Sequence, residues 1–504
     1  MNAFETLKEQ VAQVSDVLNA ISVLTWDART QMPPGGAETR GEQLATLSSL
    51  AQERLISSEL KAALDQAEAV STDLIQTRTV QRVREAVSLF ERIPPTLTAE
   101  LARSKSVSQE VWAEARKGSD FGLFAPYLAQ MIELNQRLAE AIGYTESPYD
   151  ALLQQYEPGL TARTLQDLFS SLKDGVLPLL EAIRSRSEPR WDFLTRDFLE
   201  DQQRSFNVYA AELFGYDFTR GRLDTSAHPF EISFTRQDVR ITTRYERRYL
   251  PMSLFGTLHE VGHALYEQGV APELTRSALT SDFAGLYAVG GASYGTHESQ
   301  SRLWENLIGR SLPFWERHFA KLQTVFPEQL GDVDTNTFYR AVNRVSPSLI
   351  RVEADEVTYN LHIMLRVELE TALLNGTLEV AELPEAWNAK LGEYLGLTPP
   401  DDASGVLQDI HWSAGLFGSF PTYTVGNVMA SQFFGAAKTQ VAGLDEALAA
   451  GNYAPLRTWL TENIYQYGRT YTPQELLERS TGQSLTVAPY LEYLDQKYRD
   501  LYDL

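Results

Sequence analysis

The stretch SLFGTLHEVGHALYEQG, residues 253–269, contains the pattern HExxH and decides how the rest of the chain is interpreted. Its apolar residues recur at spacings that predict a helix with one buried face: Leu254, Leu258, Val261 and Leu265. On such a helix, residues four apart lie one above the other, so His259 and His263 can reach one metal ion. Glu260 can then act as general base toward a water molecule at that metal.

The ends of this helix and the rarity of histidine support the same interpretation. We expect Ser253 to cap the first turn and Gly269 to end the helix. The chain holds only 7 histidines among 504 residues, so a chance HExxH pattern is rare. A metal site is therefore favoured over two unrelated surface histidines.

Composition excludes several classes of protein. A formal net charge of -23 argues against nucleic-acid binding and against anionic membranes. The chain has no cysteine, which excludes disulfides and thiolate zinc sites and fits a reducing compartment. The N-terminal MNAFETLKEQ lacks the apolar core of a secretory signal, and no apolar run approaches the roughly 20 residues of a membrane span. We expect a cytoplasmic protein with no nucleic-acid or membrane partner.

Most of the chain has the periodicity of amphipathic helices. The clearest examples are residues 5–24, 40–67, 124–142, 299–308 and 357–374. The Pro- and Gly-rich breaks between such segments are short, so we expect a single domain over residues 1–504. Residues 230–234 and 239–245 differ, because they are rich in β-branched and aromatic residues and flank a turn at 235–238. The predicted fold class is mainly α, with a small β-hairpin just before the HExxH helix.

Two histidines leave a catalytic zinc ion one protein ligand short. Glu267 is a poor candidate, because eight residues after His259 it lies about 12 Å along the helix axis. Gly269 stands where the pattern HExxHxxGxxH requires a third histidine, which excludes that subclass. Glu298, in a helix that we expect Thr296 to cap, is the candidate ligand. The same position suits a first-turn glutamate stabilised by the helix dipole, and the residues alone leave both interpretations open.

Six motifs occur in order along the chain. They are WDART from Trp26, HPF from His228, HEVGH from His259, HESQ from His297, IRVEAD from Ile350 and GVLQDIHW from Gly405. With these motifs the chain resembles the M32 family of metallocarboxypeptidases, the Taq carboxypeptidase or thermostable carboxypeptidase 1 type. The resemblance implies a saddle-like helical fold with a deep groove and a small sheet near the metal, and a homodimer. It also implies release of C-terminal amino acids with broad specificity, except at proline.

The residues and the resemblance together predict metal-assisted amide hydrolysis of the EC 3.4.17 type on peptides with a free C-terminus. The expected metal ligands are His259, His263 and Glu298, the last because the HES motif supplies the third ligand in relatives. Glu260 is the expected general base. Imidazole and carboxylate ligands suit zinc, with cobalt or manganese as alternatives.

Four further residues are candidates for contacts with the substrate. His228, His411 and Tyr423 are candidate donors to the tetrahedral oxyanion, and each has a structural hydrogen bond as its alternative role. Arg351 is the candidate for binding the substrate carboxylate, because a guanidinium group binds a carboxylate in a bidentate manner. Its alternative role is an ion pair with Glu353, Asp355 or Glu356, and Asp355 could hold either Arg351 or a histidine ligand.

Two other functions remain open at this point. The first is a helical zinc oligopeptidase that cleaves internally, and the second is a non-enzymatic helical protein with a structural metal. Structural zinc sites usually have four Cys or His ligands, so three ligands without cysteine favour an open catalytic site. Four glycines within residues 278–295 also predict a mobile flap between the two ligand-bearing helices.

Overall fold

The computed structural model describes residues 2–504, which divide into two compact units. Unit 1 comprises Met1–Phe90, Pro189–Val342 and Met429–Leu485, and unit 2 comprises Glu91–Glu188, Asn343–Val428 and Thr486–Leu504. Each unit is assembled from three separate stretches of chain, so no single linker divides them. One catalytic domain over residues 1–504 stays a prediction.

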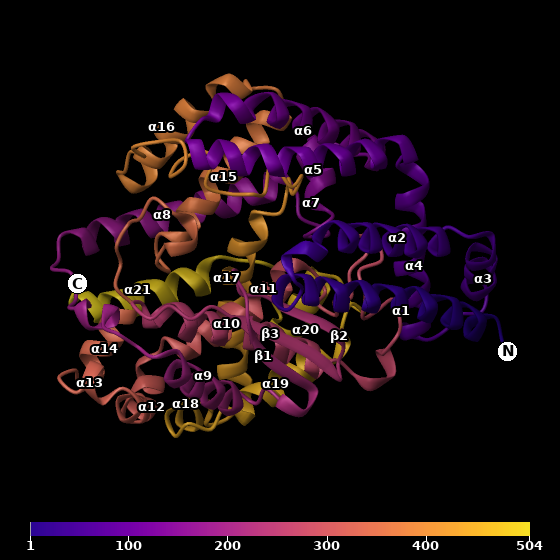
Figure 1. Cartoon of the computed structure of the whole chain (residues 1–504). Helices are drawn as coiled ribbons and strands as arrows, with labels where there is room; N and C mark the ends of the chain where they lie inside the picture. The colour runs from indigo at the N-terminus through magenta and orange to yellow at the C-terminus, as the bar shows by residue number, and fades with distance from the viewer. Residues whose placement is uncertain (1) are drawn as a thin grey trace. The chain divides into compact units, whose positions relative to one another are not determined.

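Unit 1 consists of helices, connecting loops and three short strands, which are labelled in Figure 1. Helices that lie wholly or mostly in it are α1 (Ala3–Thr30), α2 (Ala37–Leu55), α3 (Ser58–Glu68), α4 (Leu74–Arg92), α9 (Glu200–Phe214), α10 (Leu250–Gly269), α11 (Tyr294–Arg302), α12 (Leu312–Val325), α13 (Pro327–Leu330), α14 (Thr335–Val342), α17 (Pro421–Gln440), α18 (Leu444–Ala449), α19 (Ala454–Asn463) and α20 (Pro473–Thr481). A π-helical turn, Leu303–Gly309, continues α11. Short 3-10 turns are Pro34–Gly36, Asp192–Thr195, Phe218–Arg220, Pro272–Leu274 and Tyr465–Tyr467.

Unit 2 is built from helices in all three of its stretches. These helices are α5 (Pro95–Gly118), α6 (Phe121–Ile142), α7 (Pro148–Leu153), α8 (Ala162–Arg184), α15 (Tyr359–Leu374), α16 (Leu383–Leu395) and α21 (Ala488–Tyr502). Helices α5 and α6 run side by side (Figure 1), and 3-10 turns lie at Arg351–Glu353 and Val380–Glu382. The mainly α class predicted from periodicity is confirmed. No helix within residues 2–504 is both long and apolar enough to cross a membrane.

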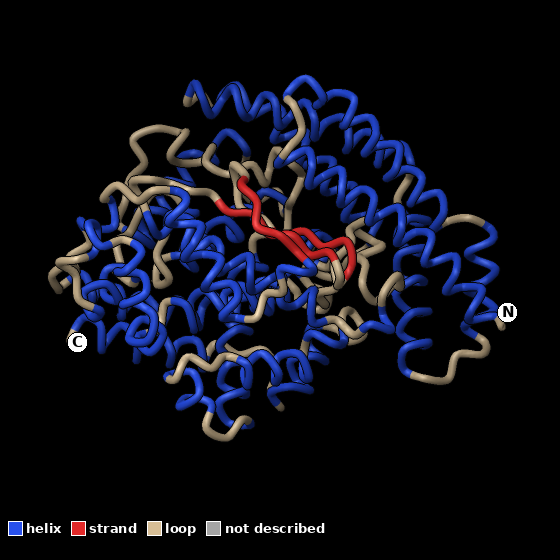
Figure 2. Tube along the Cα trace, turned by 60° about the horizontal axis from the view of Figure 1, so that its bottom comes forward, coloured by secondary structure: helices blue, strands red, loops and turns tan. Residues whose placement is uncertain are grey.

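The three strands, red in Figure 2, form one small sheet in unit 1. Their order in the sheet is β1-β3-β2. Strands β2 (Glu231–Thr235) and β3 (Asp238–Thr243) pair antiparallel, which confirms the predicted hairpin. Strand β1 (Gly221–Thr225) pairs in parallel with β3 and was not predicted. Helices α1 and α10 both pack against the sheet, so the HExxH helix lies directly against the hairpin.

Helix boundaries differ from the predictions where side chains find other partners. Helix α10 begins at Leu250, because the predicted cap Ser253 is buried and donates its hydroxyl to Gln203. Helix α11 begins at Tyr294, since Ser293 accepts the backbone N–H of Thr296 at 2.9 Å and so takes the capping role predicted for Thr296. The predicted helix 40–67 is two helices, because the Ser57 side chain caps a new helix at residue 58.

Candidate metal centre

Two helices of unit 1 bring three metal-binding groups together. His259 and His263 extend from α10 and Glu298 from α11, and their ligand atoms all lie within 4.8 Å of one another. The carboxylate Oε2 of Glu298 lies 3.3 Å from Nε2 of His263 and 3.5 Å from Nε2 of His259. The Glu298 side chain is buried, while both histidines are partly exposed. Three ligands with one accessible side are what an open catalytic site requires.

Gly262, within the HExxH pattern, allows the two helices to approach this closely. A Cβ atom at this position would lie 2.4 Å from the carbonyl oxygen of Gln300 and 2.5 Å from the Cα atom of Ser301. Both atoms belong to the backbone of α11, so only glycine permits the observed approach of the helices. The close approach carries Glu298, two residues before Gln300, up to the two histidines.

The Glu298 carboxylate is oriented by residues of its own helix. Arg302, one turn later, donates from Nε to Oε1 of Glu298 at 2.7 Å, and the Ser301 hydroxyl donates to Oε2. Burial opposes the charge of this carboxylate, but Arg302 and the two histidines outweigh burial and hold its pKa well below the usual value. The group is therefore an anion, as a metal ligand must be.

The outer nitrogen of His259 contacts a second carboxylate. Nδ1 of His259 lies 3.0 Å from Oε2 of Glu305, which sits in the π-helical turn that follows α11. Arg310 binds the other oxygen of Glu305 at 3.0 Å, and Arg302 lies 3.5 Å from Oε2. A carboxylate that accepts the Nδ1–H fixes the histidine tautomer whose Nε2 lone pair can bind a metal.

The outer nitrogen of His263 contacts a third imidazole instead. Nδ1 of His263 lies 2.6 Å from Nδ1 of His297, and Nε2 of His297 lies 2.9 Å from Oε1 of Glu267. Glu267, rejected above as a metal ligand, is thus bonded to His297 and is absent from the ligand cluster. Burial lowers the pKa of His263 to about 3, so its ring is neutral and can offer a lone pair.

Glu260 lies on α10 beside the ligands and is 6% exposed. Burial raises the pKa of Glu260 to about 7, and the nearby Glu298 and Glu305 add to this increase while His259 opposes it. A carboxylate whose pKa lies near neutral pH can both take up and release a proton, as a general base and acid must.

The Gly-rich segment 278–295 is largely built into unit 1. Ala278, Leu279, Phe283 and Ala292 are buried in it. Gly290 and Gly291 are required by close approach: a Cβ atom would lie 2.9 Å from Oε2 of Glu267 at Gly290 and 2.6 Å from the His297 ring at Gly291. These two positions therefore require glycine because a side chain would collide with Glu267 or His297, whereas the composition predicts a hinge role for them.

His228 does not join this cluster in the structure. Its backbone carbonyl accepts the hydroxyl of Ser226 at 2.7 Å, while the imidazole is exposed. Within residues 2–504 the imidazole has no hydrogen bond or ring contact. The neighbouring Pro229 lies over Gly256 of α10, one helical turn before Glu260.

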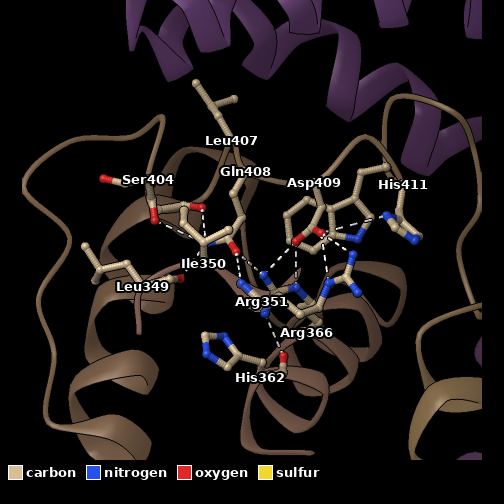
Figure 3. A network of polar contacts seen from close by, with 12 residues as sticks. Leu349, Ile350, Arg351, His362, Arg366, Ser404, Leu407, Gln408, Asp409 and His411 are labelled. Carbon is tan, nitrogen blue, oxygen red and sulfur yellow. Dashed lines mark hydrogen bonds and ion pairs between the residues drawn. The ribbon is translucent and has the colours of Figure 1, made fainter. Parts of the chain in front are cut away.

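Arg351 lies in unit 2, in an ionic network centred on Asp409 (Figure 3). Its Nε and Nη2 atoms donate to Oδ1 of Asp409 at 3.0 and 2.9 Å, and its Nη1 donates to the hydroxyl of Tyr359. Arg366 donates to Oδ2 of Asp409 at 2.6 Å. The side-chain oxygen of Gln408 accepts from the backbone N–H of Arg351 and from Nη2 of Arg366. The structural ion pair considered for Arg351 therefore exists, but its partner is Asp409.

Two of the partners predicted for Arg351, Asp355 and Glu356, have other bonds; the Glu356 carboxylate binds Lys497 at 2.7 Å. Asp355 accepts the backbone N–H groups of Ser346, Val357 and Thr358, so it caps the chain before α15 instead of holding Arg351. The prediction for Asp355 was wrong, because short carboxylates compete for nearby backbone donors.

His411 and Tyr423 contact each other in the same unit. Nε2 of His411 lies 3.3 Å from the hydroxyl of Tyr423, and Nδ1 of His411 has no hydrogen-bond partner within residues 2–504. Burial lowers the pKa of His411 to about 3, so the ring is neutral and one ring nitrogen carries a proton that it can donate. The ring also stacks on Phe420.

Sequence reasoning missed the residues that support the ligands. Arg302 and Glu305 follow Glu298 at intervals of four and seven, so they share its helical face, and that spacing could have identified them. The sequence shows His297 only as the first residue of the HESQ motif and predicts no role for its side chain. Its contact with His263 joins two helices and has no signature in either helix alone.

The residues present fit a divalent metal by their chemistry. Two imidazoles and an ionised carboxylate form a donor set that first-row divalent ions accept, and the carboxylate charge is compensated by Arg302. An HExxH helix with a buried glutamate beside its ligands, and a third ligand from a later helix, defines the chain as a metallopeptidase of the HExxH class.

Comparisons with known proteins give the family within this class. A model of the Carboxypeptidase Taq (M32) metallopeptidase family matches residues 6–498. The chain is 42% identical to thermostable carboxypeptidase 1 of Thermus thermophilus over 99% of both proteins. It is 38% identical to carboxypeptidase 1 of Bacillus subtilis over 99% of this chain and 98% of that protein. A solved structure of the M32 carboxypeptidase from Deinococcus radiodurans matches 100% of both chains with a TM-score of 0.96 and 41% identity.

The chain therefore belongs to the M32 family, and the resemblance drawn from its motifs is confirmed. It is a metal-dependent carboxypeptidase that acts on peptides.

Proposed function

We propose that His259, His263 and Glu298 hold the divalent metal of this carboxypeptidase and that Glu260 is its general base. The observation that carries the proposal is the approach of three ligand atoms to within 4.8 Å, with the buried Glu260 on the same helix. The alternative role of Glu298, a glutamate that only stabilises a helix dipole, does not require contact with both histidines.

The roles of the protein groups in amide hydrolysis follow from their positions. The metal, when bound, supplies Lewis acidity that polarises the scissile carbonyl and makes water more acidic. Glu260 accepts a proton from the attacking water and later delivers it to the leaving amine nitrogen. Glu305 keeps His259 in the tautomer that offers Nε2.

Arg351 is proposed to bind the C-terminal carboxylate of the substrate. A guanidinium group has five N–H donors, and the bonds to Asp409 and Tyr359 use three of them. The Arg351 side chain thus retains donors for a second carboxylate, and Asp409 holds the guanidinium in a defined orientation. His228, His411 and Tyr423 remain proposed donors to the oxyanion, with His411 favoured because of its buried neutral ring.

Several finer properties are proposed on the family resemblance. Zinc is the proposed metal, since two imidazoles and a carboxylate are a common catalytic zinc set, with cobalt or manganese as alternatives. Broad specificity for C-terminal residues other than proline, a homodimer and a cytoplasmic location complete the proposal. Metal analysis of the purified protein and light scattering after size exclusion test the metal and the dimer.

Time-resolved mass analysis of a peptide digest tests the proposed function. A carboxypeptidase shortens a free-acid peptide stepwise from its C-terminus and leaves the C-terminally amidated peptide almost intact. Glu260→Gln should abolish stepwise shortening and keep the metal, while Glu273→Gln, at an exposed carboxylate in the same unit, should behave as wild type. Internal cleavage of both peptides would instead identify an oligopeptidase.

A further inference from the structure

The two ligand histidines differ in what their outer nitrogens contact. His259 meets the carboxylate of Glu305 directly, whereas His263 meets the imidazole of His297, and only then comes the carboxylate of Glu267. Direct contact with a carboxylate is the usual arrangement for a metal-binding histidine. An imidazole placed between ligand and carboxylate needs its own explanation.

We propose that His297 is a positioning residue that holds His263 in the tautomer and orientation that metal binding needs. Glu267 and the backbone N–H of Gly290 in turn hold His297. The proposal rests on the proposed function, because it assumes that His263 is a metal ligand.

The placement of the protons follows from the contact between the two rings. A distance of 2.6 Å between the two Nδ1 atoms requires one proton between them, because two lone pairs or two N–H groups would repel each other. A metal at Nε2 of neutral His263 leaves the ring proton on Nδ1. His263 is therefore the donor and His297 the acceptor, so the proton of His297 lies on Nε2. That nitrogen faces Glu267 at 2.9 Å, where a carboxylate accepts it.

The ring geometry suits this hydrogen bond. The ring planes of His263 and His297 lie 17° apart with centroids at 4.6 Å, and their Nδ1 atoms lie 2.6 Å apart, within hydrogen-bond reach. Tyr266, fully buried, stacks on His297 with an angle of 16° between planes and a centroid distance of 5.4 Å. The ring of His297, itself 8% exposed, is thus fixed from its face as well as from both nitrogens.

The far end of this chain of contacts is also fixed. Both oxygens of Glu267 accept the backbone N–H of Gly290, at 2.9 and 3.0 Å. Arg469 donates to the carbonyl oxygen of Gly291 at 2.8 Å and so anchors the backbone that lies over the His297 ring. A Cβ atom at either glycine would enter the space of Glu267 or His297. The two glycines, which looked like hinge residues in the sequence, are what this arrangement requires.

The intermediate imidazole has a chemical consequence. Glu305 places a negative charge directly on the outer nitrogen of His259, which raises the basicity of that ligand. His297 offers His263 a neutral acceptor and keeps the charge of Glu267 one ring further away. His297 therefore fixes the orientation and tautomer of His263 without direct contact between a carboxylate and the outer nitrogen of this ligand.

The test compares substitutions at His297 that keep or remove the acceptor. His297→Phe keeps a ring for stacking on Tyr266 but has no acceptor, whereas the side-chain oxygen of His297→Asn can occupy the Nδ1 position. His318→Phe is the matched control, because His318 is a buried histidine of the same unit bonded to Tyr209 and Tyr453. Zinc-loaded protein is titrated with a chelator to measure metal affinity, and cobalt-substituted protein is examined by absorption spectroscopy.

We expect His297→Phe to lose about 10- to 100-fold in metal affinity, the usual effect of removing a partner of a ligand histidine. Its cobalt spectrum should change, because the ligand field depends on the orientation of His263. His297→Asn should recover most of the affinity and the wild-type spectrum, and His318→Phe should show neither effect. If His297→Phe does not fold, Glu267→Leu, which removes the acceptor of the Nε2–H of His297, should weaken metal binding in its place.

Wild-type affinity and spectrum in His297→Phe, or in Glu267→Leu where the former does not fold, would overturn the proposal. Equal losses in His297→Phe and His297→Asn would also overturn it, since a purely structural role does not distinguish an acceptor from its absence. His263→Ala separates this proposal from the proposed function. Wild-type metal affinity in His263→Ala would refute the ligand assignment itself, whereas a loss there with an unaffected His297→Phe would refute only the role of His297.

Discussion

Gly262→Ala should move Glu298 away from the two ligand histidines, although alanine is the better helix former. The added Cβ would lie 2.4 Å from the Gln300 carbonyl oxygen, and ordinary contact begins at 3.4 Å, so the helices must separate by about 3.4 − 2.4 = 1.0 Å. Such overpacking costs about 1–3 kcal/mol, while replacing glycine by alanine in a helix gains about 1 kcal/mol. The free energy of unfolding should therefore fall by about 0–2 kcal/mol. Activity should fall further, because a displacement of about 1 Å at a catalytic group can cost 10²-fold in rate.

Gly256→Ala provides the matched control in the same helix. A Cβ atom there meets only Pro229 Cγ at 3.8 Å and Thr243 Oγ1 at 3.9 Å, so the helix-propensity gain of up to about 1 kcal/mol should remain uncompensated. Urea unfolding of both variants, metal affinity, and kcat/KM on a free-acid peptide are the measurements. Wild-type metal affinity and kcat/KM in Gly262→Ala would refute the view that this glycine brings the ligands together.

Three further predictions concern single carboxylates or arginines. Glu298→Ala should lose metal on dialysis, whereas Glu260→Gln should keep it and lose about 10²–10⁴-fold in kcat; equal metal content in both variants would move the third ligand elsewhere. Arg351→Ala should lower kcat/KM on free-acid peptides by an amount that corresponds to about 1.5–3 kcal/mol of lost transition-state stabilisation. It should have little effect on kcat/KM for amidated peptides. Equal losses on both substrates would mean that Arg351 only compensates the charge of Asp409. Burial raises the pKa of Glu370 to about 8 from 4.5, so the folded state keeps a proton that the unfolded state has lost. The stability from this group is complete below pH 4.5 and is lost as the pH rises through about 8, with a slope of up to about 1.4 kcal/mol per pH unit. Urea unfolding at pH 5 to 8 should show this loss in the wild type relative to Glu370→Gln, and parallel curves would contradict it.

Patterns confined to one helix or hairpin were predictable from the sequence. The HExxH helix and the hairpin before it depend on local spacing. The candidate ligand Glu298 depends instead on the HES motif of relatives, and the structure brings it to both histidines. Capping was less predictable, because a serine within a helix can find a remote partner, as Ser253 does in Gln203. Strand β1 could not be predicted, because it has only five residues and shows little alternation of apolar and polar residues.

Partners that come from distant segments could not be predicted. Arg351 has acidic residues within five positions, yet its carboxylate partner is Asp409, 58 residues later. The contact of His297 with His263 likewise depends on how two helices cross. Local charge patterns suggest that a partner is needed, but the choice among carboxylates depends on tertiary packing.

The assembly of unit 1 from three stretches of chain has a consequence for biosynthesis. Its apolar core joins Leu7, Val11 and Leu18 of the first stretch to Ala278 and Phe283 of the second. Arg78 of the first stretch bonds Glu475 of the third. A ribosome completes α1 to α4 long before it has made these partners, and at 5–20 residues per second the wait is on the order of tens of seconds. The nascent N-terminal helices therefore expose apolar faces for that time, so slow folding and a need for protection from aggregation are built into the order of the chain.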